Sequence, residues 1–89
     1  MVTSWKIKKI NRDIAKIEIE IEELNAELQK HKEKMQKGVI TKAQFSKARI
    51  NISDKMRGLS GAINRKKKAR QMIEDDLKEK EEEKEKEAL

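Results

Sequence analysis

Apolar residues recur through the first 35 positions of the chain at intervals that alternate between three and four. The positions that carry this spacing are Ile7, Ile10, Ile14, Ile17, Ile21, Leu24, Leu28, His31 and Met35, and only the histidine among them is polar. Alternating steps of three and four are the heptad spacing of a helix that packs one stripe against another helix. The pattern predicts a helix over about residues 4–37.

The next few residues carry the signals of a helix end followed at once by a helix start. Gly38 suits the left-handed conformation that closes a helix C-terminus. Thr41 suits the N-cap of a second helix, and Gln44 is placed to complete a capping box. Ile40 and Phe45 have the spacing of a hydrophobic staple across that cap. The chain is therefore predicted to reverse direction here.

The second helix continues the seam and sets the register of a hairpin. Its apolar seam residues are Phe45, Ile52, Met56, Leu59, Ile63, Ile73 and Leu77. Facing residues of an antiparallel hairpin have numbers with a constant sum, and the sum is 80 for Met35 with Phe45, Leu28 with Ile52, Leu24 with Met56, Ile21 with Leu59, Ile17 with Ile63, and Ile7 with Ile73. The sequence predicts an all-α fold, a long antiparallel two-helix coiled-coil hairpin over residues 1–77, with a turn at 38–41 and the second helix at about 42–77.

Two segments of the second half leave alternatives open. Gly58 and Gly61 indicate either a close helix approach or a local bend, or else a break that gives three helices. Residues 78–89 mix Glu and Lys without an apolar face. We expect this tail to be a solvated, fraying helix or disordered.

Two polar residues fall within the seam. Lys66 lies opposite Ile14, where its alkyl stem is expected to pack while the ammonium reaches Glu18 or solvent. The alternative is that Lys66 fixes the register or the oligomeric state. His31 has no Cys, second His or serine nucleophile beside it, so we interpret it as a polar seam residue opposite Ala48 and Arg49.

Composition narrows the function classes. Of the 89 residues 45% are charged and none is Cys, which excludes disulfides and thiolate metal sites and favours a cytoplasmic protein. No apolar run approaches the ~18 residues of a membrane-spanning helix. Lys, Glu and Ile are enriched as in thermophile proteins. No phosphate loop or metal motif is present, and the paired carboxylates lie on solvated faces, so we expect no enzyme, cofactor or small-molecule substrate.

The net charge is +6, and the charged residues are distributed unevenly along the chain. Residues 41–73 carry ten Lys and Arg against one acid, whereas residues 74–89 carry four Lys against nine acids. Folding of the hairpin brings the basic run of the second helix beside the basic start of the first. The side chains predicted to contact phosphates are Lys8, Lys9, Arg12, Arg65, Lys67, Lys68 and Arg70.

The turn also resembles a known family. The run Gly38-Val39-Ile40-Thr41-Lys42-Ala43-Gln44-Phe45, with Ala48 and Ile52 after it and Leu28 and Met35 before it, is similar to the turn of the SHOCT (short C-terminal) domain. The resemblance covers about residues 24–59. It implies a small helical hairpin that serves in oligomerisation or as an attached interaction module.

Three functional hypotheses follow. The first is a non-enzymatic protein-interaction or oligomerisation module, because a two-helix hairpin covers its seam on one side only and a four-helix bundle or another helical protein would cover the rest. Its seam would be held by Ile10, Ile14, Ile17, Ile21, Leu59 and Ile63. The alternative is salt-sensitive binding of the nucleic-acid backbone by the basic residues. A third is attachment of the same residues to an anionic membrane, with Trp5 and Val2 as the interfacial anchor.

Overall fold

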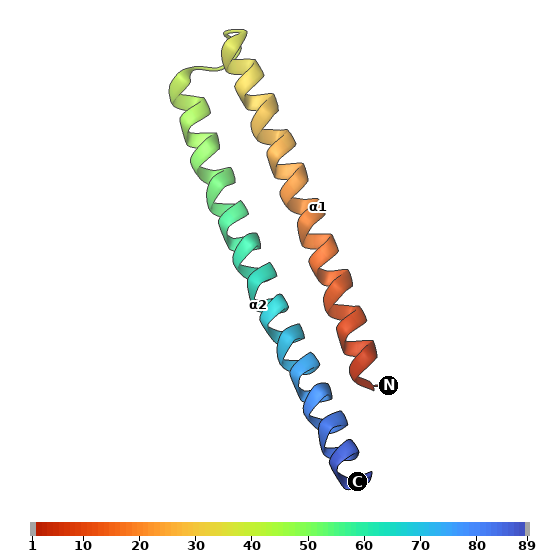
Figure 1. Cartoon of the computed structure of the whole chain (residues 1–89). Helices are drawn as coiled ribbons and strands as arrows, with labels where there is room; N and C mark the ends of the chain where they lie inside the picture. The colour runs from red at the N-terminus through yellow and green to blue at the C-terminus, as the bar shows by residue number, and fades with distance from the viewer. Residues whose placement is uncertain (1, 89) are drawn as a thin grey trace.

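The chain forms a rod of two antiparallel helices (Figure 1). The computed structural model describes the backbone of residues 2–88 and the side-chain exposure of residues 5–87. Helix α1 spans Val2–Gln36 and helix α2 spans Lys42–Ala88, and the rod measures 74 × 16 × 14 Å. The predicted all-α hairpin is confirmed, and both helices extend beyond their predicted outer ends.

The turn between the helices has the predicted capping chemistry. Gly38 has a φ of +76°, and the amide of Val39 donates to the carbonyl of Lys34 at 2.8 Å, which together close α1 in a Schellman arrangement. At the start of α2 the Thr41 amide donates to Gln44 Oε1 at 2.9 Å, and the Gln44 amide donates to Thr41 Oγ1 at 3.1 Å. This reciprocal pair is a capping box, and it fixes where α2 begins.

The seam residues predicted from the heptads all lie between the helices. Ile14, Ile52 and Ile63 are buried, with exposed fractions of 6%, 4% and 9%, and the other seam residues are half-buried. Two hydrogen bonds cross between the helices, from Lys66 to Asp13 and from Arg70 to Asn11. Their residue numbers sum to 79 and 81, which agrees with the predicted register.

Helix α2 is one continuous element through Gly58 and Gly61, so the three-helix alternative is wrong. It also continues through the charged tail and runs past the start of α1 (Figure 1). Leu77 is the last half-buried residue, and residues 78–87 are exposed. At a rise of about 1.5 Å per residue, the part of α2 with no α1 beside it is about 15 Å long.

Candidate functional site

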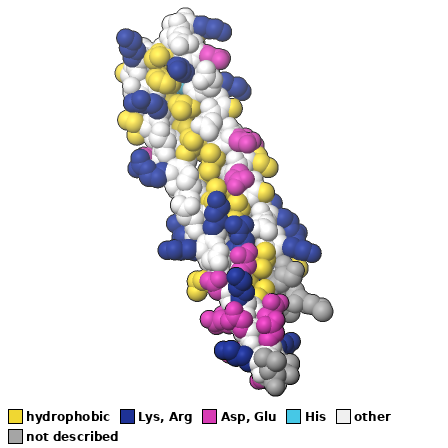
Figure 2. Space-filling view, viewed as in Figure 1, with side chains coloured by type: hydrophobic (Ala, Val, Ile, Leu, Met, Phe, Trp, Pro, Cys, Tyr) yellow, Lys and Arg dark blue, Asp and Glu magenta, His cyan; other side chains and the backbone are white. Residues whose placement is uncertain are grey.

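The predicted phosphate-binding residues surround the rod near the open end of the hairpin. We define the basic collar as the exposed side chains of Lys8, Lys9, Arg12, Arg65, Lys67 and Lys68. Neighbouring residues of a helix point about 100° apart, so Lys8 and Lys9 leave α1 in different directions, as Lys67 and Lys68 leave α2. Figure 2 shows basic side chains on both edges of the rod at this height and between them. The structure thus brings these residues to one height but not to one face.

Arg70 is not part of the free cationic surface. It falls on the seam opposite Ile10, it is half-buried, and its Nη1 donates to Asn11 Oδ1 at 2.7 Å. A guanidinium held in this way is directed at the neighbouring helix rather than at solvent. The prediction that Arg70 contacts phosphate therefore has no support in this geometry, and Arg70 instead links the two helices.

Lys66 has a different partner from the one expected. Its Nζ lies 3.3 Å from Asp13 Oδ2, and the exposed fractions of the two side chains are 36% and 33%. Glu18 as the predicted partner is wrong, because Asp13 lies almost level with Lys66 on the adjacent helix, whereas the expected partial exposure of Lys66 to solvent is observed. An ion pair this accessible contributes about 0–1 kcal/mol. It therefore offsets part of the free energy lost by placing a cation in the apolar seam and adds little net stability.

Charge alternates in bands along the rod. The collar region, residues 6–16 with residues 65–70, carries ten cations against one carboxylate, Asp13. Next towards the turn, residues 18–27 of α1 carry five Glu and no cation, while residues 53–62 of α2 at the same level carry Lys55 and Arg57 against Asp54, so the acidic character lies on the α1 side. The far end of α2 is acidic again, and acidic side chains gather there in Figure 2. Because the bands differ in sign, the rod has strong fields of both signs despite a modest net charge.

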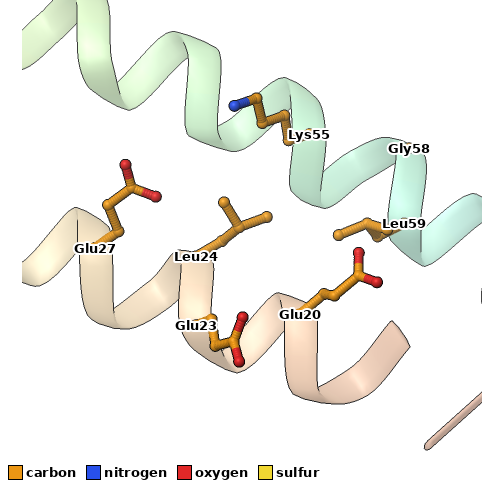
Figure 3. A pocket seen from close by; sticks show the side chains of 7 residues that line it. All are labelled: Glu20, Glu23, Leu24, Glu27, Lys55, Gly58 and Leu59. Atoms are coloured by element: carbon orange, nitrogen blue, oxygen red, sulfur yellow. The ribbon is translucent and has the colours of Figure 1, made fainter. Parts of the chain in front are cut away.

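An open groove lies between the helices at the acidic band (Figure 3). Leu24 of α1 and Leu59 of α2 point into it, and Gly58 leaves room beside them. The rim is polar and is formed by Glu20, Glu23, Glu27 and Lys55. An apolar floor with a charged rim is the arrangement by which protein surfaces bind a helix. The sequence analysis did not predict this groove. The absence of a side chain at Gly58, which lies near Leu24 in the predicted register, could have indicated it.

Large apolar side chains are also exposed outside the groove. They are Trp5, Ile19, Val39, Ile50 and Met72, with exposed fractions from 54% to 71%. Trp5, the aromatic member of the proposed membrane anchor, lies beside Lys9 and Arg12. The side chain of Val2, the other member, lies outside the described residues. Neither helix has a segment apolar enough to cross a membrane, over the residues that the structure describes.

His31 is half-buried in the seam, as predicted. Its Nδ1 donates to the backbone carbonyl of Glu27, 2.8 Å away, so the ring is held within its own helix. Among the described residues no three His, Cys, Asp or Glu side chains gather in a way that would hold a metal ion.

Fold and surface together define the class of this chain, an all-α helical hairpin with a charged exterior and a slender apolar seam. Comparison with protein-family models, with curated proteins and with solved structures found no match. The resemblance of the turn to the SHOCT domain accordingly stays a prediction, and function has to be argued from the surfaces described above.

Proposed function

We propose that this chain is a non-enzymatic oligomerisation module, a hairpin that associates with further helices, those of a second copy first of all. One observation carries the proposal: among the side chains that the structure describes, only Ile14, Ile52 and Ile63 are buried, and none is less than 2% exposed. In a two-helix hairpin each helix covers only the inner side of the other, so half-buried apolar residues remain open to water along both flanks of the rod. Association with other helices removes them from water.

The amount of exposed surface supports the same conclusion. The chain exposes 7541 Å², whereas a compact monomer of this mass exposes about 5,400 Å². Its radius of gyration is 20.9 Å, against about 12 Å for a compact domain of this length. The excess of about 2,100 Å² exceeds the ~800 Å² that each partner contributes to an ordinary stable interface. The rod therefore has ample area for a partner.

Sedimentation equilibrium of the full chain over a wide concentration range tests this proposal. We expect the mass to rise from that of one chain towards that of two or four chains as concentration rises. The helical signal in circular dichroism should become more heat-resistant in parallel, because association stabilises the folded state by mass action. A chain that keeps the mass of one copy at every concentration, with an unfolding midpoint independent of concentration, would contradict the proposal.

The basic collar favours a second candidate function, binding of a nucleic-acid backbone. Its six side chains are exposed, and none of them makes an ion pair within the part of the chain that the structure describes. Cations on all sides of a rod suit phosphate contacts that ignore base sequence. Changing Lys67 and Lys68 to Glu should abolish binding of a random duplex and leave the helical signal intact. The matched control is the same change at Lys80 and Lys84 in the exposed tail, which should alter binding far less. If both double variants lose the same amount of duplex binding, the binding depends on the net charge of the chain and not on the basic collar.

A further inference from the structure

We propose that the outer face of the first half of α1 docks on an anionic lipid surface, with Trp5 and Ile19 in the interface and four cations among the headgroups. The outer face is the side of α1 that is turned away from α2. The inference goes beyond the proposed self-association, which uses the flanks of the rod and leaves this face free. Either proposal can therefore fail while the other stands.

The outer face combines basic and apolar side chains and contains no acid. In the heptads of α1 its outward positions are Trp5, Lys8, Lys9, Arg12, Ala15, Lys16 and Ile19, and all of these side chains are exposed. At a rise of about 1.5 Å per residue, the stretch is about 21 Å long. The next outward positions are Glu22 and Glu23, so the basic face ends there.

The acids beside the outer face do not neutralise it. Asp13 lies next to the seam, where its Oδ2 is 3.3 Å from Lys66 Nζ of α2. Glu18 and Glu20 occupy flanking positions at the far end of the stretch. The four cations of the outer face make no ion pair within the part of the chain that the structure describes. An anionic surface is therefore complementary in charge to this face.

The two large apolar side chains favour lipid over nucleic acid. Trp5 and Ile19 are 59% and 54% exposed, and with Arg12 between them they lie seven residues apart on one line along the helix. A phosphate backbone offers such side chains no apolar contact. At a membrane interface the indole ring and the isoleucine leave water while the indole N–H stays hydrated. The alkyl stems of lysine and arginine can lie along the same interface with their charges among the phosphates.

The shape of the outer face favours a fluid surface over an acidic protein. The face is the convex side of one helix, on a rod only 16 × 14 Å across. A rigid partner would contact such a ridge along a narrow strip. Lipid headgroups can close around it, as they do around helices that lie in the plane of an interface.

The acidic tail does not prevent this docking. The tail belongs to α2, which packs on the opposite side of α1. Packed helices have axes about 8–10 Å apart, so α2 lies at least that much farther from the lipid than α1 does. This separation is about one Debye length at physiological ionic strength, and repulsion between the tail and the lipid is largely screened.

Fluorescence of Trp5 tests the docking directly. The chain has one Trp and no Tyr, so its emission reports on this face. The full chain is titrated with vesicles of equal parts phosphatidylserine and phosphatidylcholine, with vesicles of phosphatidylcholine alone, and with a short random duplex. We expect the anionic vesicles to shift the emission to shorter wavelength, the neutral vesicles to leave it unchanged, and high salt to abolish the shift.

Two results of this titration would overturn the inference. The first is an emission that anionic vesicles leave unchanged at every lipid concentration; if the duplex changes it instead, the face binds nucleic acid and not lipid. The second is an equal shift with neutral and anionic vesicles, which would remove the role of the cations.

A pair of matched variants tests whether binding depends on this face or on net charge. Lys9→Gln with Lys16→Gln should weaken binding to the anionic vesicles by about 25-fold, because each cation near an anionic surface strengthens binding by about fivefold. The control, Lys67→Gln with Lys68→Gln, removes the same charge at the same height of the rod from exposed positions of α2, and should weaken binding by less than about fivefold. Circular dichroism checks that both variants are helical. Equal losses would refute the assignment of the face.

The role of Trp5 is tested by co-sedimentation with the same anionic vesicles. Trp5→Ala should weaken binding by about tenfold, because a large apolar side chain no longer leaves water. Met72→Ala is the matched control, since Met72 is 71% exposed but lies on α2, and it should change binding by less than about twofold. A Trp5→Ala variant that binds as the original chain does would overturn the inference.

Discussion

The sharpest test of the seam compares one substitution at two positions of α2. Ile52 is 4% exposed and Ile50 is 59% exposed, although only one residue separates them. Both are isoleucines within the same helix, so replacement by alanine changes helix propensity and unfolded-state terms in the same way. Only the burial of the side chain differs.

The magnitude follows from the atoms removed. Ile→Ala deletes three carbons, and each buried methylene-sized group contributes about 0.8 kcal/mol, so Ile52→Ala should lower the free energy of unfolding by about 2.4 kcal/mol. The space left opposite Leu28 adds to this, although a seam open to water can relax, so we expect a total of about 2–3 kcal/mol. Ile50→Ala should change it by less than about 0.5 kcal/mol.

Unfolding in urea, monitored by circular dichroism, gives the change in the free energy of unfolding for each variant. The original chain and the two variants are compared at one protein concentration, because self-association shifts apparent stability. A loss of about 2–3 kcal/mol corresponds to a fall in melting temperature of about 10 °C or more for a chain of this size. Equal effects of the two substitutions, or a larger one at Ile50, would refute the assignment of the seam.

Three further outcomes follow from the turn, the seam cation and the tail. Gly38→Ala places a side chain at a φ of +76° and should lower the free energy of unfolding in urea by about 1–2 kcal/mol; a change below about 0.5 kcal/mol would contradict the strain at this turn. Lys66→Leu replaces an accessible ion pair with an apolar seam residue and should raise the melting temperature, whereas a clear fall would assign the pair with Asp13 a role in fixing the register. Truncation after Lys78 removes the part of α2 that has no α1 beside it, so the unfolding midpoint should stay within error; a large drop would show that the tail stabilises the hairpin in some other way.

The fold was predictable because its determinants are local or periodic. Gly38, Thr41 and Gln44 act within a few residues of one another, so spacing alone gives the turn and its hydrogen bonds. The seam repeats every seven residues on both helices, and two such repeats joined by a short turn admit one register. Whether the tail would be helical was not predictable in this way, because a run of Glu and Lys has helical pairings but no packing face to decide the matter.

The surface was less predictable because it depends on where long side chains lie. Arg70 belongs to the seam by its heptad position, yet its basic neighbours led to its assignment as a phosphate ligand. Lys66 pairs with Asp13 and not with Glu18 because the two side chains lean towards each other across the interface. The groove needed both helices in place, since Leu24 and Leu59 form its floor from opposite sides. Each of the two contacts with Asp13 and Asn11 joins a seam residue of α2 to the residue next to the seam on α1, which is why the numbers sum to 79 and 81 rather than to 80.

The most direct test of the proposed oligomerisation is the light-scattering mass of the full chain on a sizing column, with and without a short random duplex, at low and high salt. The proposed function predicts the mass of two or four chains without the duplex, and the same protein peak when the duplex is present. A single-chain mass, with a duplex-bound peak that disappears at high salt, would contradict it and would make the basic collar the functional surface with the hairpin as its scaffold.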